Sequence, residues 1–479
     1  MYIGGLDIGT SGCKIAVFNE KGAFVKCEYA EYDVKRSCGL HEINAEEIFN
    51  CVKKVVSRLE ISELAALGVT SFGETFVMLD ENDKPCAPSM LYTDPRGKTE
   101  CKRIAEHFGE ECLAYLTGTK PHEMYSLPKI VWIKENMSDS YARARHILLI
   151  QDYIVYMLTG NAQIDHSLAA RTACFDIENK CWAEDVMKFC GIDPKLLSKP
   201  VPSGTVAGVI KPEIACEMNV NPTLKVVSGC HDQIAAMTGA GVFEVGEAMD
   251  GTGTVECVPV VMDSVPKDFS IFECGYSFAP HINGKYACYV LSYTGGATLK
   301  WYRDNFSDKS YEQLDVEVSD EPTDLLIMPH FAGAATPYMD TSSRAAIIGL
   351  TFEHKKADIY KALMEGTAYE IAVNLGVVGD YGIAPRLLAA TGGGARSETW
   401  LQIKADVLGV AIAASDGDEV GAAGTAYLAG YAIGVYDDDT RLINVKKIFY
   451  PNPGRRQIYR GQLEKYKKIY ECVRKILND

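Results

Sequence analysis

The 479-residue chain is 47% hydrophobic and 23% charged, and it carries a formal net charge of −16. This composition is typical of a soluble globular protein, and the length exceeds what one hydrophobic core supports, so two or three domains are expected. The negative charge argues against nucleic acid or an anionic membrane surface as the main partner, and no run approaches the ~18 apolar residues of a membrane span.

The 16 cysteines are scattered, without a C-x-x-C pair or a cluster at zinc spacing. Several of them, including Cys190, Cys257 and Cys288, have apolar neighbours. Met1 leads directly into a strand-like segment. We therefore expect no signal peptide, reduced buried thiols and a cytoplasmic location.

The chain begins with a predicted strand over residues 2–6, a polar turn over residues 7–14 and a second strand over residues 15–18. The turn, Asp-Ile-Gly-Thr-Ser-Gly-Cys-Lys, brings backbone N–H groups and hydroxyls to one point, which suits phosphate oxygens. It has neither the P-loop pattern nor G-x-G-x-x-G. Asp7 at its start is placed to hold Mg2+ through water, although hairpin turns often contain glycine and serine without any ligand.

Residues 41–58 have the apolar spacing of a helix, and residues 64–69 and 76–79 have the character of buried strands. Three charged residues stand at the ends of strand-like segments: Glu74, Asp94 and Arg96. Exposed charge at the rim of a sheet is one interpretation of each. The other is a polyol site, since carboxylates accept hydroxyl hydrogens in pairs and arginine donates in a fork.

Residues 127–135 and 147–158 are predicted helices, and residues 165–175 and 200–208 are predicted loops. An apolar strand over residues 224–227 then leads to Gly229, expected to supply a turn, and to the start of a helix. Asp232 and Gln233 would follow the carboxyl end of that strand, the edge at which open α/β sheets bind ligands. We expect Asp232 to be ionised at neutral pH, stabilised by the helix N-terminus; a plain helix cap is the alternative role.

The second half of the chain repeats the first turn in miniature. Met249-Asp250-Gly251-Thr252 matches Asp7-Ile8-Gly9-Thr10, and a strand over residues 255–261 follows, which suggests two related halves, each with a phosphate turn. Residues 294–297, Thr-Gly-Gly-Ala, precede one predicted helix, and residues 358–375 form another. A strand at residues 386–390 runs into three consecutive glycines before a helix over residues 398–408, and such a turn lets backbone approach an anionic or flat ligand closely.

Alternating strands and helices predict an α/β architecture in both halves. Two phosphate turns, a triple-glycine turn and an aspartate at a strand end fit phosphoryl transfer between two domains. That chemistry needs positioning and charge neutralisation more than a strong base.

In this order and spacing, the motifs make the sequence similar to the FGGY family of carbohydrate kinases, within the sugar kinase/Hsp70/actin superfamily. The segments that carry the resemblance are residues 7–14 and 249–254 (phosphate motifs), 92–96 (the aromatic-x-Asp-x-Arg sugar motif), 229–241 (the catalytic segment), 295–301 (a helix start beside the nucleotide), and 391–408 with 421–426 (the adenosine motif and final signature). The resemblance implies two RNase H-like, actin-like ATPase domains, residues 1–241 and 242–479, with an interdomain cleft. It also implies ATP, Mg2+ and transfer of the γ-phosphoryl group to a sugar or polyol hydroxyl.

The resemblance assigns roles to individual residues as well. Asp232 would be the general base, and Asp7 would belong to the metal neighbourhood. The sugar or polyol would contact Glu74, Thr75, Asp94, Arg96 and Gln233. ATP would contact Thr10, Ser11, Gly12, Lys14, Thr252, Gly253, Gly296, Lys300, Gly393 and Gly394.

The features that resemble known acceptor sites are mixed. Phe72-Gly73-Glu74-Thr75 stands where xylulose kinases typically carry Met-His-Gly and glycerol kinases Arg-Glu-Thr. Gln233 also resembles glycerol kinases, and His231 is similar to deoxyketose kinases. We expect a ketose or sugar alcohol, xylulose- or ribulose-like, with a glycerol-type polyol kinase as the alternative.

A third possibility, of another class, is an actin- or Hsp70-like ATPase or binding module. Such a module would keep the phosphate turns but need no sugar pocket, so the four charged residues Glu74, Asp94, Arg96 and Asp232 together argue against it. Family members are often dimers or tetramers, and a homodimer is the corresponding expectation.

Overall fold

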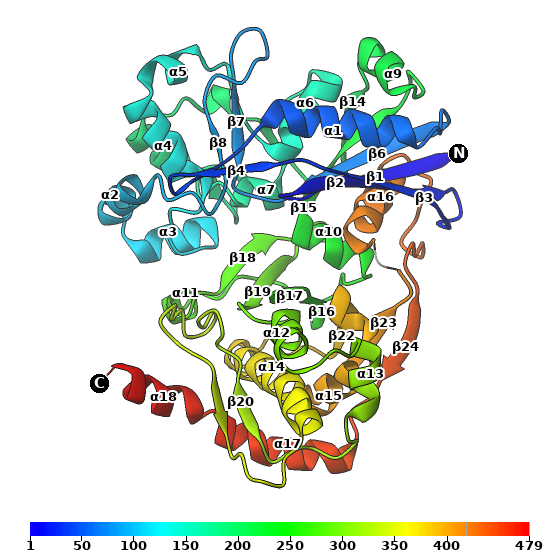
Figure 1. The fold of residues 1–479 in the computed structure, drawn as a ribbon. Helices are drawn as coiled ribbons and strands as arrows, with labels where there is room; N and C mark the ends of the chain where they lie inside the picture. Colours follow the sequence, from blue (N-terminus) through cyan, green and yellow to red (C-terminus); the bar gives the residue numbers. More distant parts are fainter. Residues whose placement is uncertain (418, 479) are drawn as a thin grey trace. The chain divides into compact units, whose positions relative to one another are not determined.

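The computed structural model describes residues 1–417 and 419–478 of the chain (Figure 1). They form two compact units. The first contains Met1–Gly241, Phe278–Tyr286 and Glu419–Ile443, and the second contains the rest of the described chain. The chain leaves the first unit after Gly241 and returns to it twice, so two segments that follow residue 242 in sequence lie in the first unit.

The first unit is built on a six-stranded sheet in the order β14-β15-β6-β1-β2-β3. Its strands are β1 (Tyr2–Ile8), β2 (Gly12–Asn19), β3 (Phe24–Glu31), β6 (Leu64–Ser71), β14 (Thr205–Val209) and β15 (Lys225–His231). Its helices are α1 (Ala45–Arg58), α2 (Lys98–Phe108), α3 (Glu110–Thr117), α4 (Ser126–Asn136), α5 (Ser138–Arg143), α6 (Ile150–Thr159), α7 (His166–Ala170), α8 (Glu184–Cys190), α9 (Pro212–Met218), α10 (Asp232–Gly239) and α16 (Val420–Ala432). β1, β6 and β15 are parallel, so their carboxyl ends meet at one edge of the sheet.

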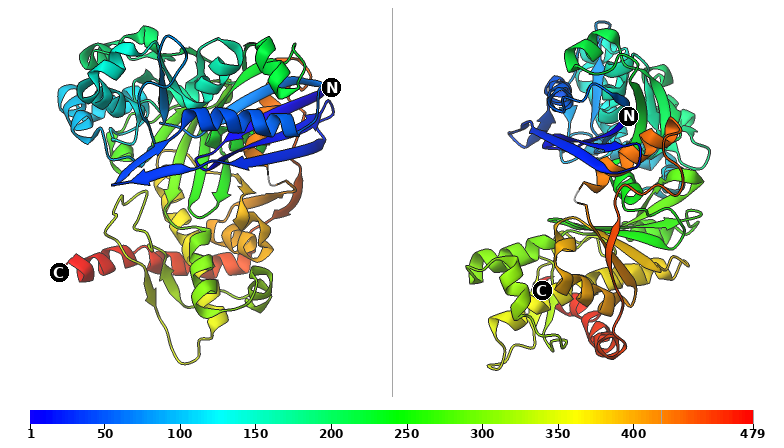
Figure 2. Two further views of the ribbon diagram at one scale, coloured as in Figure 1. Left: turned by 45° about the horizontal axis from the view of Figure 1, so that its top comes forward. Right: turned by 90° about the vertical axis from the view of Figure 1, so that its right-hand side faces the viewer.

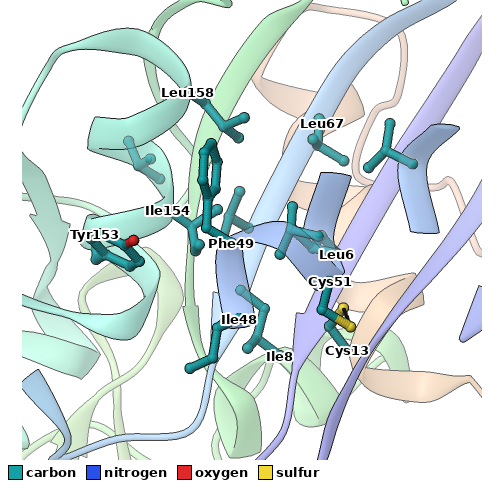
Figure 3. Close-up of a cluster of buried hydrophobic side chains, with 14 of the residues drawn as sticks. Leu6, Ile8, Cys13, Ile48, Phe49, Cys51, Leu67, Tyr153, Ile154 and Leu158 are labelled. Atoms are coloured by element: carbon teal, nitrogen blue, oxygen red, sulfur yellow. Dashed lines mark hydrogen bonds between the residues drawn. The ribbon is translucent and has the colours of Figure 1, made fainter. Parts of the chain in front are cut away.

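Successive residues of β1 point to opposite faces of this sheet. Leu6 and Ile8 belong to a buried core that also contains side chains of α1 and α6 (Figure 3). Asp7 faces α16 instead, because a Cβ atom placed on Gly421 would lie 2.6 Å from Asp7 Oδ2. The alternation of the strand therefore turns Asp7 away from the apolar core and toward the first turn of α16.

Helix α16, the orange ribbon in Figure 1, lies against β1 and α10, and their backbones approach closely. A Cβ on Gly5 would lie 1.8 Å from the carbonyl oxygen of Ala422, and one on Gly239 would lie 1.9 Å from that of Val420. Gly229 acts in the same way. It lies inside β15, where a Cβ would meet Val69 O at 2.5 Å, so the prediction that it supplies a turn was wrong.

The second unit repeats the sheet of the first. Its strands run in the order β19-β17-β16-β22-β23-β24. They are β16 (Glu247–Thr252), β17 (Glu256–Met262), β19 (Tyr286–Ser292), β22 (Leu387–Thr391), β23 (Ala411–Ser415) and β24 (Val445–Phe449). As in the first unit, the central strand pairs antiparallel on one side (β16 with β17) and parallel on the other (β16 with β22), and the parallel neighbour β23 is followed by an antiparallel edge strand. This shared order confirms the prediction of two related α/β halves.

The second unit has seven α-helices among the described residues. They are α11 (Phe269–Glu273), α12 (Gly296–Phe306), α13 (Tyr311–Glu317), α14 (Lys356–Gly379), α15 (Glu398–Leu408), α17 (Pro453–Tyr466) and α18 (Ile469–Asn478). All of them except α11 contribute side chains to one apolar cluster. The two C-terminal helices, α17 and α18, are the red ribbons in Figure 2. Their tyrosine side chains pack into this cluster with α14 and α15. Within residues 1–417 and 419–478, no helix is both long enough and apolar enough to cross a bilayer, the 24-residue α14 included.

Short strands account for most of the wrong boundaries. Residues 41–58 contain β5 (Leu40–Ile43) before α1, and residues 147–158 contain most of β9 (His146–Leu149) before α6. Each strand has four residues and continues directly into an apolar helix, so hydrophobic periodicity alone does not separate them. The loops predicted at residues 165–175 and 200–208 were also wrong, because they contain the short helix α7 and most of β14.

Candidate active site

Asp232 is the first residue of α10, directly after β15, as predicted. The neighbouring Gln233 donates hydrogen bonds to its carboxylate from both backbone and side chain. His231 Nε2 lies 3.2 Å from Asp232 Oδ1. Burial and the positive charge of Arg171 lower the pKa of His231 to about 3, so the imidazole beside the carboxylate is neutral at pH 7.

The environment of Asp232 overturns the expectation that the helix N-terminus lowers its pKa. Burial raises the pKa of Asp232 to about 6, against the opposing hydrogen bonds from Gln233 and the charge of Arg171. Desolvation of this partly buried carboxylate exceeds the contribution of one helix terminus. The group is still mostly ionised at pH 7, since one pH unit above the pKa leaves about ten carboxylates for each carboxylic acid.

The first turn places Asp7 near Asp232. Burial raises the pKa of Asp7 to about 7, and the negative charge of Asp232 adds to the effect. Lys14 lies opposite Asp7 in the register of strands β1 and β2, but its ammonium forms an ion pair with Glu419 Oε2 at 2.6 Å. Thr10 is half-buried and Ser11 is exposed. Gly12 is buried, with a Cβ position 2.6 Å from Ala30 O, so its lack of a side chain serves packing between strands.

Glu74 was expected at an exposed rim or in a polyol site, and it is 4% exposed. Its Oε1 accepts Arg171 Nε at 2.6 Å and a second, shorter contact from Arg171 Nη2. Its backbone is left-handed, with φ 67°, a conformation that costs on the order of 1–3 kcal/mol for a residue other than glycine. The surroundings hold this strained backbone, because Ser126 Oγ also donates to Glu74 O at 2.6 Å.

Arg171 is the central residue that sequence reasoning missed. It follows α7, its guanidinium lies 5.1 Å from the ring of Tyr125, and its side chain occupies the space beside Gly73, where a Cβ would meet Arg171 Cγ at 3.0 Å. Gly73 stands where the sequence departs from Arg-Glu-Thr. An arginine from another segment therefore lies beside Glu74. The available signal was one arginine inside the small, apolar run Leu168-Ala169-Ala170-Arg171.

Asp94 and Arg96 bind each other. Arg96 Nε donates to Asp94 Oδ1 and Arg96 Nη2 donates to Asp94 Oδ2, both at 2.8 Å, and Nη2 also reaches Glu42 Oε1 at 2.7 Å. Although burial opposes it, the hydrogen bonds of Arg96 and of the His41 N–H hold the pKa of Asp94 below its ordinary value. Lys129 Nζ donates to Asp94 O at 2.6 Å. Thr75, the last predicted sugar residue on this side, is fully buried and its Oγ1 has no hydrogen-bond partner within the described chain.

The predicted nucleotide residues of the second unit line one pocket of about 600 Å³. Its lining includes Thr252, Gly253, Gly296, Lys300, Gly393 and Gly394 together with Trp301, Tyr311, Tyr360, Arg396 and Trp400. The aromatic side chains supply a flat apolar surface, which the sequence analysis did not foresee. Lys300 is exposed and forms an ion pair with Asp304, one turn further along α12.

Glycines let three backbone segments of this pocket touch. Gly296 N donates to Gly253 O at 2.8 Å, which joins the start of α12 to the phosphate turn. Gly394 lies against Thr252, where a Cβ would meet Thr252 Cβ at 2.6 Å. A Cβ on Gly393 would meet no atom within 4 Å, so this glycine has open space in front of it. The triple glycine thus combines one packing role with one open backbone position.

Comparison with known proteins covers both units. The N-terminal domain model of the FGGY family of carbohydrate kinases matches residues 2–239, and the C-terminal domain model of the same family matches residues 252–433. The chain belongs to this family. The predictions of an FGGY carbohydrate kinase, of the two-domain actin-like ATPase fold and of ATP-dependent sugar kinase activity are confirmed.

The kinase is similar to relatives along nearly its whole length. It is 27% identical over 486 residues to the xylulose kinase of Bacillus subtilis (strain 168), which covers 98% of this chain and 96% of that protein. It is 29% identical over 459 residues to the gluconokinase of the same strain, with coverage of 91% and 88%. The crystal structure of a xyloylose kinase from Brucella ovis matches with a TM-score of 0.91 at 25% identity, covering 99% of this kinase and 100% of that chain.

Proposed function

We propose that this kinase transfers the γ-phosphoryl group of ATP to a hydroxyl of a ketose or sugar alcohol of the xylulose or ribulose kind, with Asp232 as the general base. The observation that carries the proposal is the group of residues around Asp232. Gln233 donates hydrogen bonds to its carboxylate, and the neutral imidazole of His231 lies beside it. The Arg171–Glu74 ion pair lies nearby with polar atoms suited to sugar hydroxyls.

The chemistry of the transfer matches this base. The acceptor oxygen attacks the γ-phosphorus, the bond to the β–γ bridging oxygen breaks, ADP leaves, and the hydroxyl proton passes to Asp232. In a loose transition state the hydroxyl loses its proton late, so a base with a pKa of about 6 suffices. The hydrogen bonds from Gln233 fix the direction in which the carboxylate accepts that proton.

Asp7 is the proposed protein contact of Mg2+. No group of three or more His, Cys, Asp or Glu side chains among residues 1–417 and 419–478 is arranged to hold a metal. The ion beside a nucleotide is usually held by one or two carboxylates, water and phosphate oxygens, and Asp7 fits that role. A divalent cation would favour the ionised form of this buried carboxylate, whose pKa of about 7 reflects burial and the repulsion of Asp232. When bound, Mg2+ neutralises charge on the β- and γ-phosphates.

The acceptor class rests on the charges beside Asp232. The guanidinium of Arg171 is paired with Glu74, so the charges of these two side chains cancel and the pair does not favour an anionic ligand. A neutral sugar suits such a surface better than a sugar acid, which favours the xylulose-like acceptor over gluconate. Glu74 Oε1 receives both Arg171 contacts, which leaves Oε2 to accept a sugar hydroxyl.

ATP is assigned to the 600 Å³ pocket of the second unit, with its phosphates at Gly253, Gly296 and Gly393 and its base among the aromatic side chains. Backbone N–H groups at a helix start and a glycine turn suit phosphate oxygens. The proposal includes a cytoplasmic location, supported by the 16 cysteines, none of which is paired in a disulfide within residues 1–417 and 419–478.

The test is ADP release from Mg-ATP with a panel of acceptors. The panel contains D-xylulose, D-ribulose, glycerol, D-gluconate, arabinitol and a blank without acceptor. Strong stimulation by a ketose or pentitol is the expected result. Stimulation by gluconate alone would overturn the acceptor class, stimulation by glycerol alone would support the polyol alternative, and equal release in the blank would leave an ATPase.

A further inference from the structure

The floor of the second phosphate turn contains a buried ionic network that the proposed mechanism does not use. Lys404 of α15 donates from Nζ to Asp250 Oδ2 at 2.7 Å, to Thr252 Oγ1 at 2.6 Å and to Glu256 Oε1 at 2.8 Å. Lys404 is 2% exposed and both carboxylate residues are at most 1% exposed. The ring of Trp400, one turn earlier on α15, lies 4.7 Å from Lys404 Nζ.

The internal repeat shows that the first phosphate turn has no counterpart of Asp250 in this network. In the alignment of the two turns, Thr10 matches Thr252, Gly9 matches Gly251, and Asp250 takes the place of Ile8. Ile8 is fully buried in the apolar core of the first unit. Asp250 therefore puts a charge where the related half of the fold puts a hydrocarbon side chain, and Lys404 and Glu256 surround that charge.

The network reaches the nucleotide pocket through Thr252. The hydroxyl of Thr252 donates to Asp250 Oδ1 at 2.8 Å and accepts from Lys404, so it points into the network instead of toward a ligand. The rest of Thr252 is enclosed by the triple glycine, because a Cβ on Gly392 would meet Thr252 O at 2.6 Å. A shift of Thr252 would therefore move the glycine backbone that lines the pocket.

Stability alone is a poor explanation for these charges. A buried ion network often stabilises a fold no more than a well-packed apolar cluster of the same size. Here two acidic side chains face one ammonium. Burial raises the pKa of Glu256 to about 8, so at pH 7 the charges of the network are mainly those of Asp250 and Lys404. Glu256 Oε2 has no hydrogen-bond partner within the described chain. The network supplies three hydrogen bonds from Lys404 Nζ of α15 to side chains on both strands of the β16–β17 hairpin. These hydrogen bonds fix the position of the hairpin against α15.

We propose that Lys404 is a positioning residue for nucleotide binding: through Thr252 it holds the second phosphate turn and the triple-glycine turn in the geometry that receives the phosphates of ATP. The inference rests on the assignment of ATP to the pocket of the second unit. Lys404 touches no ligand in this scheme, and the sugar side of the enzyme does not depend on it.

The first test compares two buried lysines of the second unit. Lys404→Met should raise the KM for ATP and the dissociation constant for ADP about 10- to 100-fold, the effect of displacing a binding group by about 1 Å, with the KM for the sugar unchanged. Lys361→Met is the matched control. Lys361 is 1% exposed and Nζ donates to Ser319 O at 2.6 Å, away from the phosphate turn. It should lower the melting temperature without changing either nucleotide constant.

A double-mutant cycle tests the route through Thr252, and its single variant Thr252→Val is the test that remains if Lys404→Met does not fold. Thr252→Val removes one hydroxyl and keeps the shape, and alone it should raise the KM for ATP in the same direction. If Lys404 acts through Thr252, the double variant should bind nucleotide no more weakly than Lys404→Met.

Two outcomes would overturn the inference: an unchanged KM for ATP in Thr252→Val, or losses that multiply in the double variant. Failure of the underlying assignment has a different result. If ATP does not bind in the pocket of the second unit, Trp400→Ala, which removes a side chain of the pocket wall, would leave ADP binding unchanged, as would the Lys404 and Thr252 variants.

Discussion

Replacing Asp232 with asparagine separates catalysis from helix stability. Asparagine keeps the size of the side chain and an oxygen that accepts the Gln233 N–H, but it does not take up a proton. The turnover number kcat should fall about 10²- to 10⁴-fold, the usual effect of removing a general base. The dissociation constant for ADP should stay the same, because the proposed nucleotide pocket is built from residues of the second unit.

The same variant should be slightly more stable than the wild-type kinase. Burial raises the pKa of Asp232 from 3.8 to about 6, and two pKa units correspond to about 3 kcal/mol against the ionised form. The side chain is 33% exposed, so solvent screening reduces this to about 1 kcal/mol. The folded state binds more protons than the unfolded state between the two pKa values, so this group lowers the free energy of unfolding as the pH rises through about 4–6. Asp232→Asn should therefore raise Tm by about 2–4 °C at pH 8 and leave it unchanged at pH 3.5.

The assay measures kcat with coupled ADP detection, Tm by calorimetry at both pH values, and ADP affinity by titration calorimetry. Asp185→Asn is the control, since Asp185 is an exposed acid in the first turn of α8 in the same unit. It should leave kcat unchanged. A folded Asp232→Asn kinase with near-normal kcat would refute the base assignment. A loss of kcat accompanied by a Tm several degrees lower would refute the reasoning about burial, because the ionised carboxylate would then stabilise the folded state.

Three further predictions concern the same site. The value of kcat/KM for the sugar should fall tenfold per pH unit below about pH 6, and this limb should disappear in Asp232→Asn; a limb that persists there belongs to another group. Glu74→Gln should raise the KM for the sugar about 5- to 100-fold with little change in the KM for ATP. It should also lower the pKa of Asp232, because Arg171 loses its counter-charge. An equal rise in the KM for ATP would contradict the sugar-side assignment. Mg2+ alone should raise Tm at pH 8 but not at pH 5.5, where Asp7 holds its proton. Asp7→Asn should abolish this rise in Tm. An equal rise in Tm with Mg2+ in that variant would exclude Asp7 as the contact.

Much of the fold followed from local patterns. The boundaries of β7 (Phe76–Leu79) and α15 agree with the predicted ones, and the position of Asp232 at the start of α10 was predicted from one apolar strand followed by polar residues. The repeated Gly-Thr turns indicated two related halves. The wrong predictions concern elements whose conformation depends on a distant partner. β9 is a strand because it pairs with β7, about seventy residues earlier in the sequence. The sequence of residues 146–149 alone does not indicate that pairing.

The candidate site shows the same limit more sharply. Aspartates 7 and 232 stand at strand ends and were found from the sequence. Their raised pKa values were not, because desolvation depends on what covers a carboxylate, and α16, from the end of the chain, covers Asp7. Likewise Thr252 carries a hydroxyl in a phosphate turn, the pattern of a phosphate ligand, yet the hydroxyl is bonded to Asp250 and Lys404.

The choice of acceptor depends on this long-range assembly. In the sequence, Gly73 before Glu74 looks like the loss of a positive charge from an Arg-Glu-Thr pattern. In the structure, the space that glycine leaves is filled by Arg171, whose guanidinium binds Glu74 and whose charge opposes the burial effect on Asp232. The positive charge is retained, but it comes from the segment after α7, so in the proposed sugar site it would face the acceptor from another direction. An acceptor that fits a cation at the end of β6 need not fit one beside α7. A motif comparison that aligns residue 73 with arginine therefore compares the wrong pair of residues, and the specificity of this kinase is better sought in what contacts Arg171 than in the tetrapeptide around Glu74.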